Sequence, residues 1–241
     1  MKIIAIIPAR YGSTRFPGKP LADINGRPMI WWVYNQVIKS KKINEVIVAT
    51  DDERISEICK KYDMNVMMTG EHKNHIERIN EVANKIYADY YICVNGDEPL
   101  ISSDEIDLVI PDNSDEVEFF RGAYRELTDP VETIDSGNIK IILTKNDRCI
   151  YMTRSVAPFP KGTLDFKYLK YVGIECFTKK GLEIFSTTSM GTIEKIEDID
   201  HLRFIENDIP IYFKKVNSES LSVDTKKDLE KIKILMKDKR V

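Results

Sequence analysis

The stretch that decides the fold is IIAIIPARYGSTRFPGKP, residues 3–20. Its first five residues are apolar and mostly branched at Cβ, which is typical of a strand buried on both faces. The polar part that follows contains two glycines, which let the backbone approach a ligand closely. It also carries groups that bind phosphate oxygens, namely Arg10, Ser13, Arg15 and Lys19. We therefore predict a phosphate-binding loop at the carboxyl end of a first strand. A solvated turn with ordinary surface cations is the alternative, and the spacing matches neither common glycine-rich nucleotide motif.

Two further stretches place a carboxylate at the end of an apolar run. VNGDEP, residues 94–99, carries Asp97 behind a glycine, and SVDTKKD, residues 222–228, carries Asp224. Carboxylate oxygens are the ligands that Mg²⁺ prefers beside phosphate. The two aspartates are therefore candidate metal ligands. Each has a plainer interpretation as well, Asp97 as the start of a turn and Asp224 as part of a helix cap.

Hydrophobic periodicity predicts alternating strands and helices in the first half of the chain. Strands are expected at Ile3–Ile7, Glu45–Thr50, Asn65–Met68 and Tyr90–Asn95, and helices at Met29–Ser40, Glu53–Lys61 and His75–Ala88. This order is typical of an α/β fold with a mainly parallel sheet and helices on both faces. Ligands of such sheets bind at the carboxyl ends of the strands.

The second half of the sequence has a different pattern. Strands are expected at Phe119–Leu127, Asn138–Leu143, Cys149–Thr153, Tyr168–Phe177 and Ile211–Val216, and helices at Gly181–Ser186, Lys195–Glu206 and Thr225–Met236. Residues Thr144–Asp147 form a predicted hairpin turn. We interpret residues 1–241 as one domain with an inserted mixed β segment at about 121–177, which we expect to serve substrate selection and dimerisation.

Composition excludes several classes of protein. The 36 basic and 39 acidic residues give a net charge of −3, which argues against a nucleic-acid or membrane-surface binder. Four scattered cysteines favour neither disulfides nor a zinc site. No apolar run is long enough to span a bilayer, and we expect a cytoplasmic protein.

The motifs together resemble the CMP-Kdo synthetases, the 3-deoxy-manno-octulosonate (Kdo) cytidylyltransferases. The similarity covers the opening loop and continues in order through VIVATDD (46–52), NGDEPLI (95–101), NIKIIL (138–143), IYMTRS (150–155) and VDTKKDL (223–229). The resemblance implies a nucleotide-diphospho-sugar-transferase-like fold, a homodimer, Mg²⁺ as cofactor, and the joining of CTP to a sugar acid with release of pyrophosphate. It implies CTP binding by Arg10, Ser13, Arg15, Lys19 and Arg78, catalysis by Lys19, Asp97 and Asp224, and metal binding by the same two aspartates.

The resemblance implies six acceptor-binding positions, and all of them except Arg154 differ from the family pattern. They are Asn95, Arg154, Tyr171, Glu175, Asp200 and His201. The family's HQSGT[DE]R is here HKNHIER (72–78), and Glu175 stands where the family has a tyrosine. An anion at that position would oppose a carboxylated acceptor unless the acceptor carries an amine or the glutamate points away. His75 and His201 are also candidate acid–base groups.

The resulting prediction is a Mg²⁺-dependent cytidylyltransferase whose acceptor is Kdo or a close Kdo-like acid for cell-surface polysaccharide (lipopolysaccharide or capsule). The departures raise the hypothesis of a related acid that bears an amine. Transfer to another acid, such as a nonulosonate or a phosphonate, is an alternative. A second alternative is a relative that binds nucleotide but has no activity. It is disfavoured because the cations expected to bind phosphate and both aspartates are present.

Overall fold

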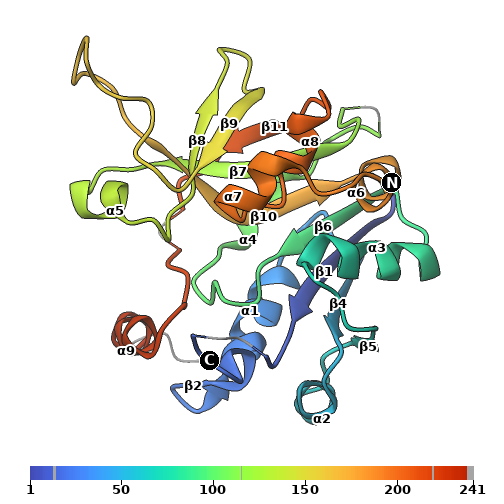
Figure 1. Cartoon of the computed structure of the whole chain (residues 1–241). Helices are drawn as coiled ribbons and strands as arrows, with labels where there is room; N and C mark the ends of the chain where they lie inside the picture. Colours follow the sequence, from blue (N-terminus) through green and yellow to red (C-terminus); the bar gives the residue numbers. More distant parts are fainter. Residues whose placement is uncertain (13–14, 115, 219, 238–241) are drawn as a thin grey trace.

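The first strand, β1 (Ile3–Ala9), lies inside the main sheet (Figure 1). The computed structural model describes residues 1–12, 15–114, 116–218 and 220–237. β1 pairs in parallel with β4 (Glu45–Thr50) on one side and with β6 (Tyr90–Val94) on the other. β5 (Val66–Met68) extends the parallel part beyond β4. The side chains of β1 are buried on both faces of the sheet, which explains its continuous apolar run.

The other half of the sheet is mixed, as the sequence predicts. Its strands are β7 (Phe120–Glu126), β8 (Lys140–Leu143), β9 (Cys149–Thr153), β10 (Leu169–Phe177) and β11 (Tyr212–Lys215). β10 runs antiparallel to β6 and so joins this half to the parallel strands. β7 pairs with β10, and β11 forms the far edge. The β8–β9 hairpin has its turn at Thr144–Asp147, as predicted.

Helices cover both faces of the sheet (Figure 1). On one face lie α1 (Met29–Val37), α2 (Glu53–Lys61) and α4 (Ser103–Val109), and on the other α3 (His75–Lys85), α6 (Lys179–Thr187) and α8 (Leu202–Glu206). The alternation along β1 agrees with this, since Ile3, Ala5 and Ile7 pack on the first face and Ile4 and Ile6 on the second. No helix in the described parts of the chain is long and apolar enough to cross a membrane.

The smaller elements complete the chain. They are the 3-10 helix η1 (Lys19–Leu21), β2 (Asp23–Ile24), β3 (Arg27–Pro28), α5 (Pro130–Ile134), α7 (Thr192–Glu197) and α9 (Lys226–Leu235). Leu229 and Ile232 of α9 pack against a cluster that contains Trp32 of α1. The last helix is thereby anchored beside the first.

The prediction of one helix over Lys195–Glu206 is wrong. The structure has two helices there, α7 and α8, because Asp198 adopts a left-handed conformation with φ 54° that ends the first. Aspartate tolerates this conformation better than most residues, so no glycine or proline signals the break. The buried Arg203 of α8 donates to both carboxylate oxygens of Glu194 in α7, at 2.9 and 2.6 Å, and so joins the two helices across the break.

Candidate active site

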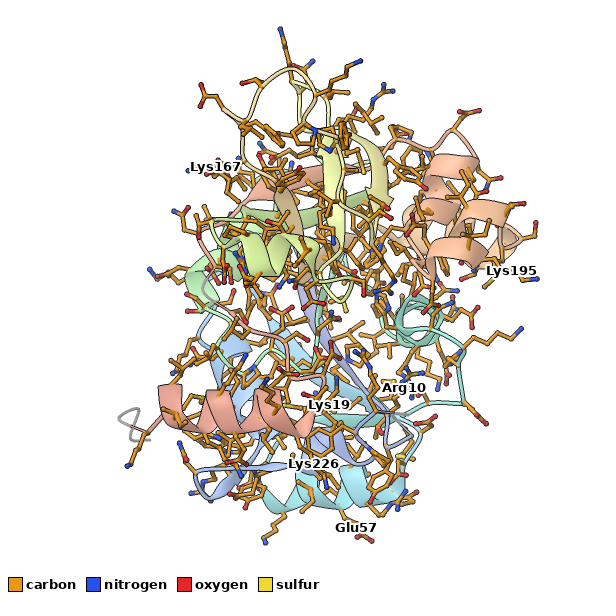
Figure 2. The ribbon with its side chains drawn as sticks, turned by 60° about the vertical axis from the view of Figure 1, so that its left-hand side comes forward. Arg10, Lys19, Glu57, Lys167, Lys195 and Lys226 are labelled. Atoms are coloured by element: carbon orange, nitrogen blue, oxygen red, sulfur yellow. The ribbon has the colours of Figure 1, made fainter. Side chains whose placement is uncertain are left out.

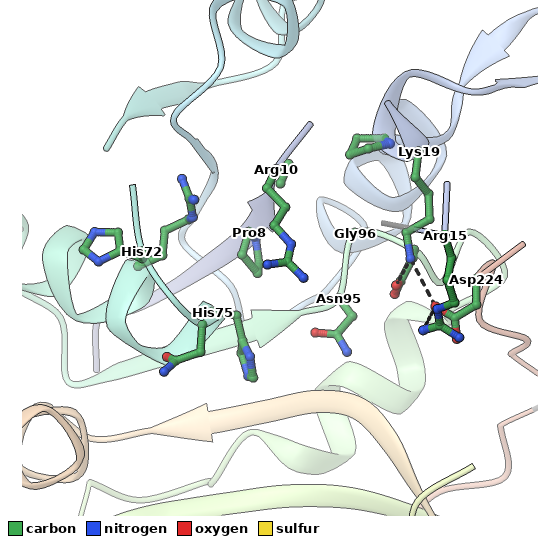
Figure 3. A pocket seen from close by; sticks show the side chains of 14 residues that line it. Pro8, Arg10, Arg15, Lys19, His72, His75, Asn95, Gly96 and Asp224 are labelled. Atoms are coloured by element: carbon green, nitrogen blue, oxygen red, sulfur yellow. Dashed lines mark hydrogen bonds and ion pairs between the residues drawn. The ribbon is translucent and has the colours of Figure 1, made fainter. Parts of the chain in front are cut away.

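A pocket of about 340 Å³ opens at the carboxyl ends of β1 and β6 (Figure 3). Its lining residues come from four segments of the chain. They are Pro8, Ala9, Arg10, Arg15, Lys19, Pro20, His72, Asn74, His75, Arg78, Asn95, Gly96, Asp97 and Asp224. Both the loop after β1 and the Gly96–Asp97 turn were predicted to lie at this edge, and the structure places them in one pocket.

The loop after β1 directs Lys19 into the pocket. Gly18 has φ 71°, and its N–H donates to the carbonyl of Tyr11 at 2.8 Å, which closes the loop. η1 then begins at Lys19, whose Nζ donates to Asp97 Oδ2 at 2.6 Å and to Asp224 Oδ1 at 3.4 Å. Arg15 reaches the same Asp224 oxygen at 3.1 Å. Lys19 and Arg15 therefore meet Asp97 and Asp224 at one end of the pocket, which Arg10 also lines. Ser13 lies outside the described residues.

The two aspartates come from distant parts of the chain. Asp97 follows β6, and a Cβ on the preceding Gly96 would lie 3.2 Å from the carbonyl of Pro8, so this position favours glycine. Asp224 precedes α9, whose N-cap Thr225 shares a capping box with Asp228. The N–H of Val223 donates to the carbonyl of Asp97 at 2.9 Å, which aligns the two segments. Figure 2 shows the first turn of α9, marked by Lys226, beside Lys19.

The donor set of Asp97 and Asp224 fits a Mg²⁺ ion. Both residues present a carboxylate oxygen to the same side-chain cation, so the position already favours positive charge. Oxygen ligands of this kind suit Mg²⁺ when phosphate oxygens complete the shell. A second set, His75, Cys93 and Glu175, has ligand atoms within 4.8 Å of one another, but its mixed nitrogen, sulfur and oxygen donors suit Mg²⁺ poorly.

A buried cluster that the sequence did not predict adjoins the pocket at His75. The fully buried carboxylate of Glu175 accepts from His75 Nε2 at 3.0 and 3.2 Å and from the hydroxyl of Tyr171. His201 Nε2 lies 2.8 Å from Glu175 Oε1, as an ionic contact rather than a well-directed hydrogen bond. Asp200 Oδ2 lies 3.5 Å from the other ring nitrogen of His75.

The charges within this cluster stabilise one another. Burial raises the pKa of the Glu175 carboxyl, but the charges of His75 and His201 outweigh it and hold that pKa well below its usual range. Burial lowers the pKa of His75, but Glu175 and then Asp200 outweigh it and raise the pKa to about 9. His75 is therefore an imidazolium at neutral pH. Glu175 is therefore compensated within the protein by His75 and His201, an arrangement that the sequence did not predict.

Of the remaining candidate residues, some line the pocket and others do not. Asn95 lines the pocket, and so does Arg78, whose buried guanidinium pairs with Asp51 at 3.0 Å. The guanidinium of Arg154 donates to backbone carbonyls, among them that of Glu197 at 2.8 Å. Arg154, Tyr171, Glu175, Asp200 and His201 are not among the described residues that line the pocket. All except Arg154 belong to the His75 cluster.

Sheet order and pocket chemistry together define a nucleotidyltransferase with the nucleotide-diphospho-sugar transferase fold. Residues 4–235 match the family model described as cytidylyltransferase. A solved CMP:2-keto-3-deoxy-manno-octonic acid synthetase, complexed with CTP, has 32% identity and a TM-score of 0.93, with 100% of both chains covered. The chain therefore belongs to the cytidylyltransferase family and, within it, to the CMP-Kdo synthetases.

Two curated relatives bear on the choice of acceptor. The mitochondrial 3-deoxy-manno-octulosonate cytidylyltransferase of Arabidopsis thaliana is 36% identical, with 100% of this chain and 85% of the relative covered. The 8-amino-3,8-dideoxy-manno-octulosonate cytidylyltransferase of Shewanella baltica is 34% identical, with 96% and 97% covered. Relatives of nearly equal identity to this chain are thus named for two different acids.

Proposed function

We propose that this chain transfers the CMP group of CTP to 3-deoxy-manno-octulosonate or a close analogue, forming a CMP-sugar and pyrophosphate. The observation that carries the proposal is the convergence of Lys19, Asp97 and Asp224 in one pocket with Arg10 and Arg15. A triphosphate needs such a group of cations. We expect the product to supply cell-surface polysaccharide synthesis, and the reaction to occur in the cytoplasm.

In the reaction, the anomeric hydroxyl oxygen of the acid bonds to the α-phosphorus of CTP. The bond from that phosphorus to the oxygen bridging to the β-phosphate breaks, the hydroxyl proton passes to water, and pyrophosphate leaves. Arg10, Arg15 and Lys19 would neutralise the charge that builds on the leaving group. Asp97 keeps Lys19 in place through the 2.6 Å contact. A Mg²⁺ ion held by Asp97 and Asp224 would supply further positive charge at the phosphates and lower the pKa of the acceptor hydroxyl.

The assay that tests this proposal is pyrophosphate release with CTP, Mg²⁺ and a panel of acids. We expect release with an octulosonic acid, and much slower release with a nonulosonate or a phosphonate. Other nucleoside triphosphates and omission of the acid serve as controls. Binding of CTP without release in the presence of any acid would instead support a relative that has lost its activity.

Dimerisation through the β segment at about 121–177 stays a prediction. Phe159 and Leu164, in the loop between β9 and β10, are largely exposed, which favours a partner on this side. Sedimentation of the purified protein tests it, and a monomer at micromolar concentration would contradict it.

A further inference from the structure

The pairing of β6 with β10 brings a thiol and a carboxylate together inside the protein. Cys93 of β6 stands opposite Glu175 of β10 in the antiparallel register, so both side chains lie on the same face of the sheet. Both residues are fully buried. Helices α3 and α8 pack over this face, in the same cluster as Cys93. Two side chains of the kind that bind transition metals therefore lie side by side under two helices.

Each of these helices begins at a histidine that faces Glu175. The first residue of α3 is His75, whose Nε2 lies 3.0 Å from Glu175 Oε2. The N-cap of α8 is His201, whose Nε2 lies 2.8 Å from Glu175 Oε1. The ligand atoms of His75, Cys93 and Glu175 all lie within 4.8 Å of one another. A thiol and two imidazoles are thus gathered around one carboxylate.

His201 supplies an independent sign that the cluster is built for a ligand. Its side chain is only 4% exposed, and within the described ranges of the chain its Nε2 makes no hydrogen bond of good geometry. Buried polar atoms are nearly always hydrogen-bonded, so such an atom calls for a partner such as an ion. The nitrogen is directed at the same carboxylate that His75 reaches. It is therefore positioned to complete a set of four ligands.

The spacing and chemistry of the four groups suit Zn²⁺. This ion prefers tetrahedral sites of sulfur, nitrogen and carboxylate oxygen, with bonds of about 2.0 to 2.3 Å, so its ligand atoms lie roughly 3 to 4 Å apart. The nitrogen–oxygen distances of 3.0 and 2.8 Å are close to this range, and the 4.8 Å limit exceeds it by less than about 1 Å. Small side-chain adjustments therefore bring the ligand atoms to the spacing of a zinc site.

The outer partners that orient metal ligands are also present. Asp200 Oδ2 lies 3.5 Å from Nδ1 of His75, the ring nitrogen that faces away from Glu175, and the hydroxyl of Tyr171 donates to Glu175. Histidines that bind a metal through one nitrogen usually donate the other N–H to a carboxylate or carbonyl. His75 is 24% exposed and lines the pocket, so an ion can enter from there.

We propose that His75, Cys93, Glu175 and His201 form a structural Zn²⁺ site, separate from the Mg²⁺ position between the two aspartates. On binding, the thiol proton of Cys93 and the Nε2 proton of His75 pass to solvent. The sulfur, one carboxylate oxygen and the Nε2 atoms of both imidazoles then bond to the ion. The thiolate and the carboxylate balance its two positive charges. The inference does not depend on the acid that the enzyme uses.

The test titrates the metal-free wild-type protein with Co²⁺, a spectroscopic substitute for Zn²⁺, in the absence of CTP. Thiolate bound to Co²⁺ gives a charge-transfer band in the near ultraviolet, whereas Co²⁺ bound by the two aspartates gives none. We expect the band to saturate at one ion per chain, to disappear on addition of Zn²⁺, and to persist in excess Mg²⁺. Absence of the band in the wild type overturns the inference and leaves the proposed function untouched.

Two cysteine variants identify the ligand. Cys93→Ser removes the sulfur, so we expect the band to vanish and the affinity for Zn²⁺ to fall on the order of a hundredfold or more. Cys176→Ser is the matched control, because Cys176 is equally buried on β10 but packs on the opposite face of the sheet. A band retained in folded Cys93→Ser, or lost from folded Cys176→Ser, contradicts the proposal.

Two variants at the partly exposed end of the cluster add a test that does not alter the buried cysteine. His75→Gln removes a ligand and should shift the visible bands of Co²⁺ as well as weaken binding. Asp200→Asn changes only an outer partner and should weaken Zn²⁺ binding about tenfold with the charge-transfer band retained. Thermal unfolding supplies a further readout, because an ion that joins β6, β10, α3 and α8 should raise the melting temperature of the wild type but not of Cys93→Ser. Equal stabilisation of both proteins by Zn²⁺ contradicts the proposal.

Discussion

Replacing Asp97 by asparagine is expected to lower kcat/KM for pyrophosphate release on the order of a hundred- to a thousandfold. The variant keeps the shape of the side chain but removes the charge that holds Lys19 at 2.6 Å. It also removes one of the two oxygen donors suited to Mg²⁺. The measurement is steady-state kinetics with CTP and the preferred acid.

Asp208→Asn is the control for this variant. Asp208 is exposed after α8 with φ 57°, a conformation that asparagine also adopts, so activity and stability should both be retained. The melting temperature of Asp97→Asn should stay near that of the wild type, because Asp97 is partly exposed. Activity within tenfold of the wild type would argue against a catalytic role for Asp97.

Replacing Arg203 by methionine is expected to lower the free energy of unfolding by about 3 to 5 kcal/mol. The substitution leaves Glu194 buried without its bidentate partner and also removes the donor to the carbonyl of Phe185 at 3.0 Å. For a chain of this size the melting temperature should fall on the order of 10 °C. Chemical denaturation and calorimetry measure the two quantities.

The control for this second variant is Lys233→Met. Lys233 pairs with Glu230 on the exposed side of α9, so its replacement should change stability little. Adding Glu194→Leu to Arg203→Met removes the unpaired buried charge and should restore part of the lost stability. A single Arg203 variant as stable as the wild type would mean that the pair does not join α7 to α8.

Local patterns in the sequence predicted which residues line the Lys19 end of the pocket. The apolar run before Arg10 predicted the buried strand β1, and the glycines and cations after it predicted the loop that the structure places in the pocket. Asp97 follows the apolar run of β6, so its position at the sheet edge was predictable as well, because parallel strands end at one edge. Asp224 follows no strand of the sheet and is brought to the same place by the segment before α9, through the hydrogen bond from Val223 to the Asp97 carbonyl.

The His75 cluster could not be predicted in the same way. His75 and Glu175 are 100 positions apart, and their contact depends on how α3 packs over β10. From the sequence alone, Glu175 could only be assessed as a single charge, without the two histidines that neutralise it. The break at Asp198 is equally hidden, because it depends on a left-handed aspartate rather than on a glycine.

The contact between Lys19 and Asp224 joins residues 205 positions apart in the chain. Ribosomal synthesis proceeds from the amino end, so the loop after β1 is made long before Asp224. A nascent chain can form β1, β4 and β6 while its loop cations still lack their second carboxylate. The charged group formed by Lys19, Asp97 and Asp224 is therefore complete only in a chain that has been synthesised at least as far as Asp224.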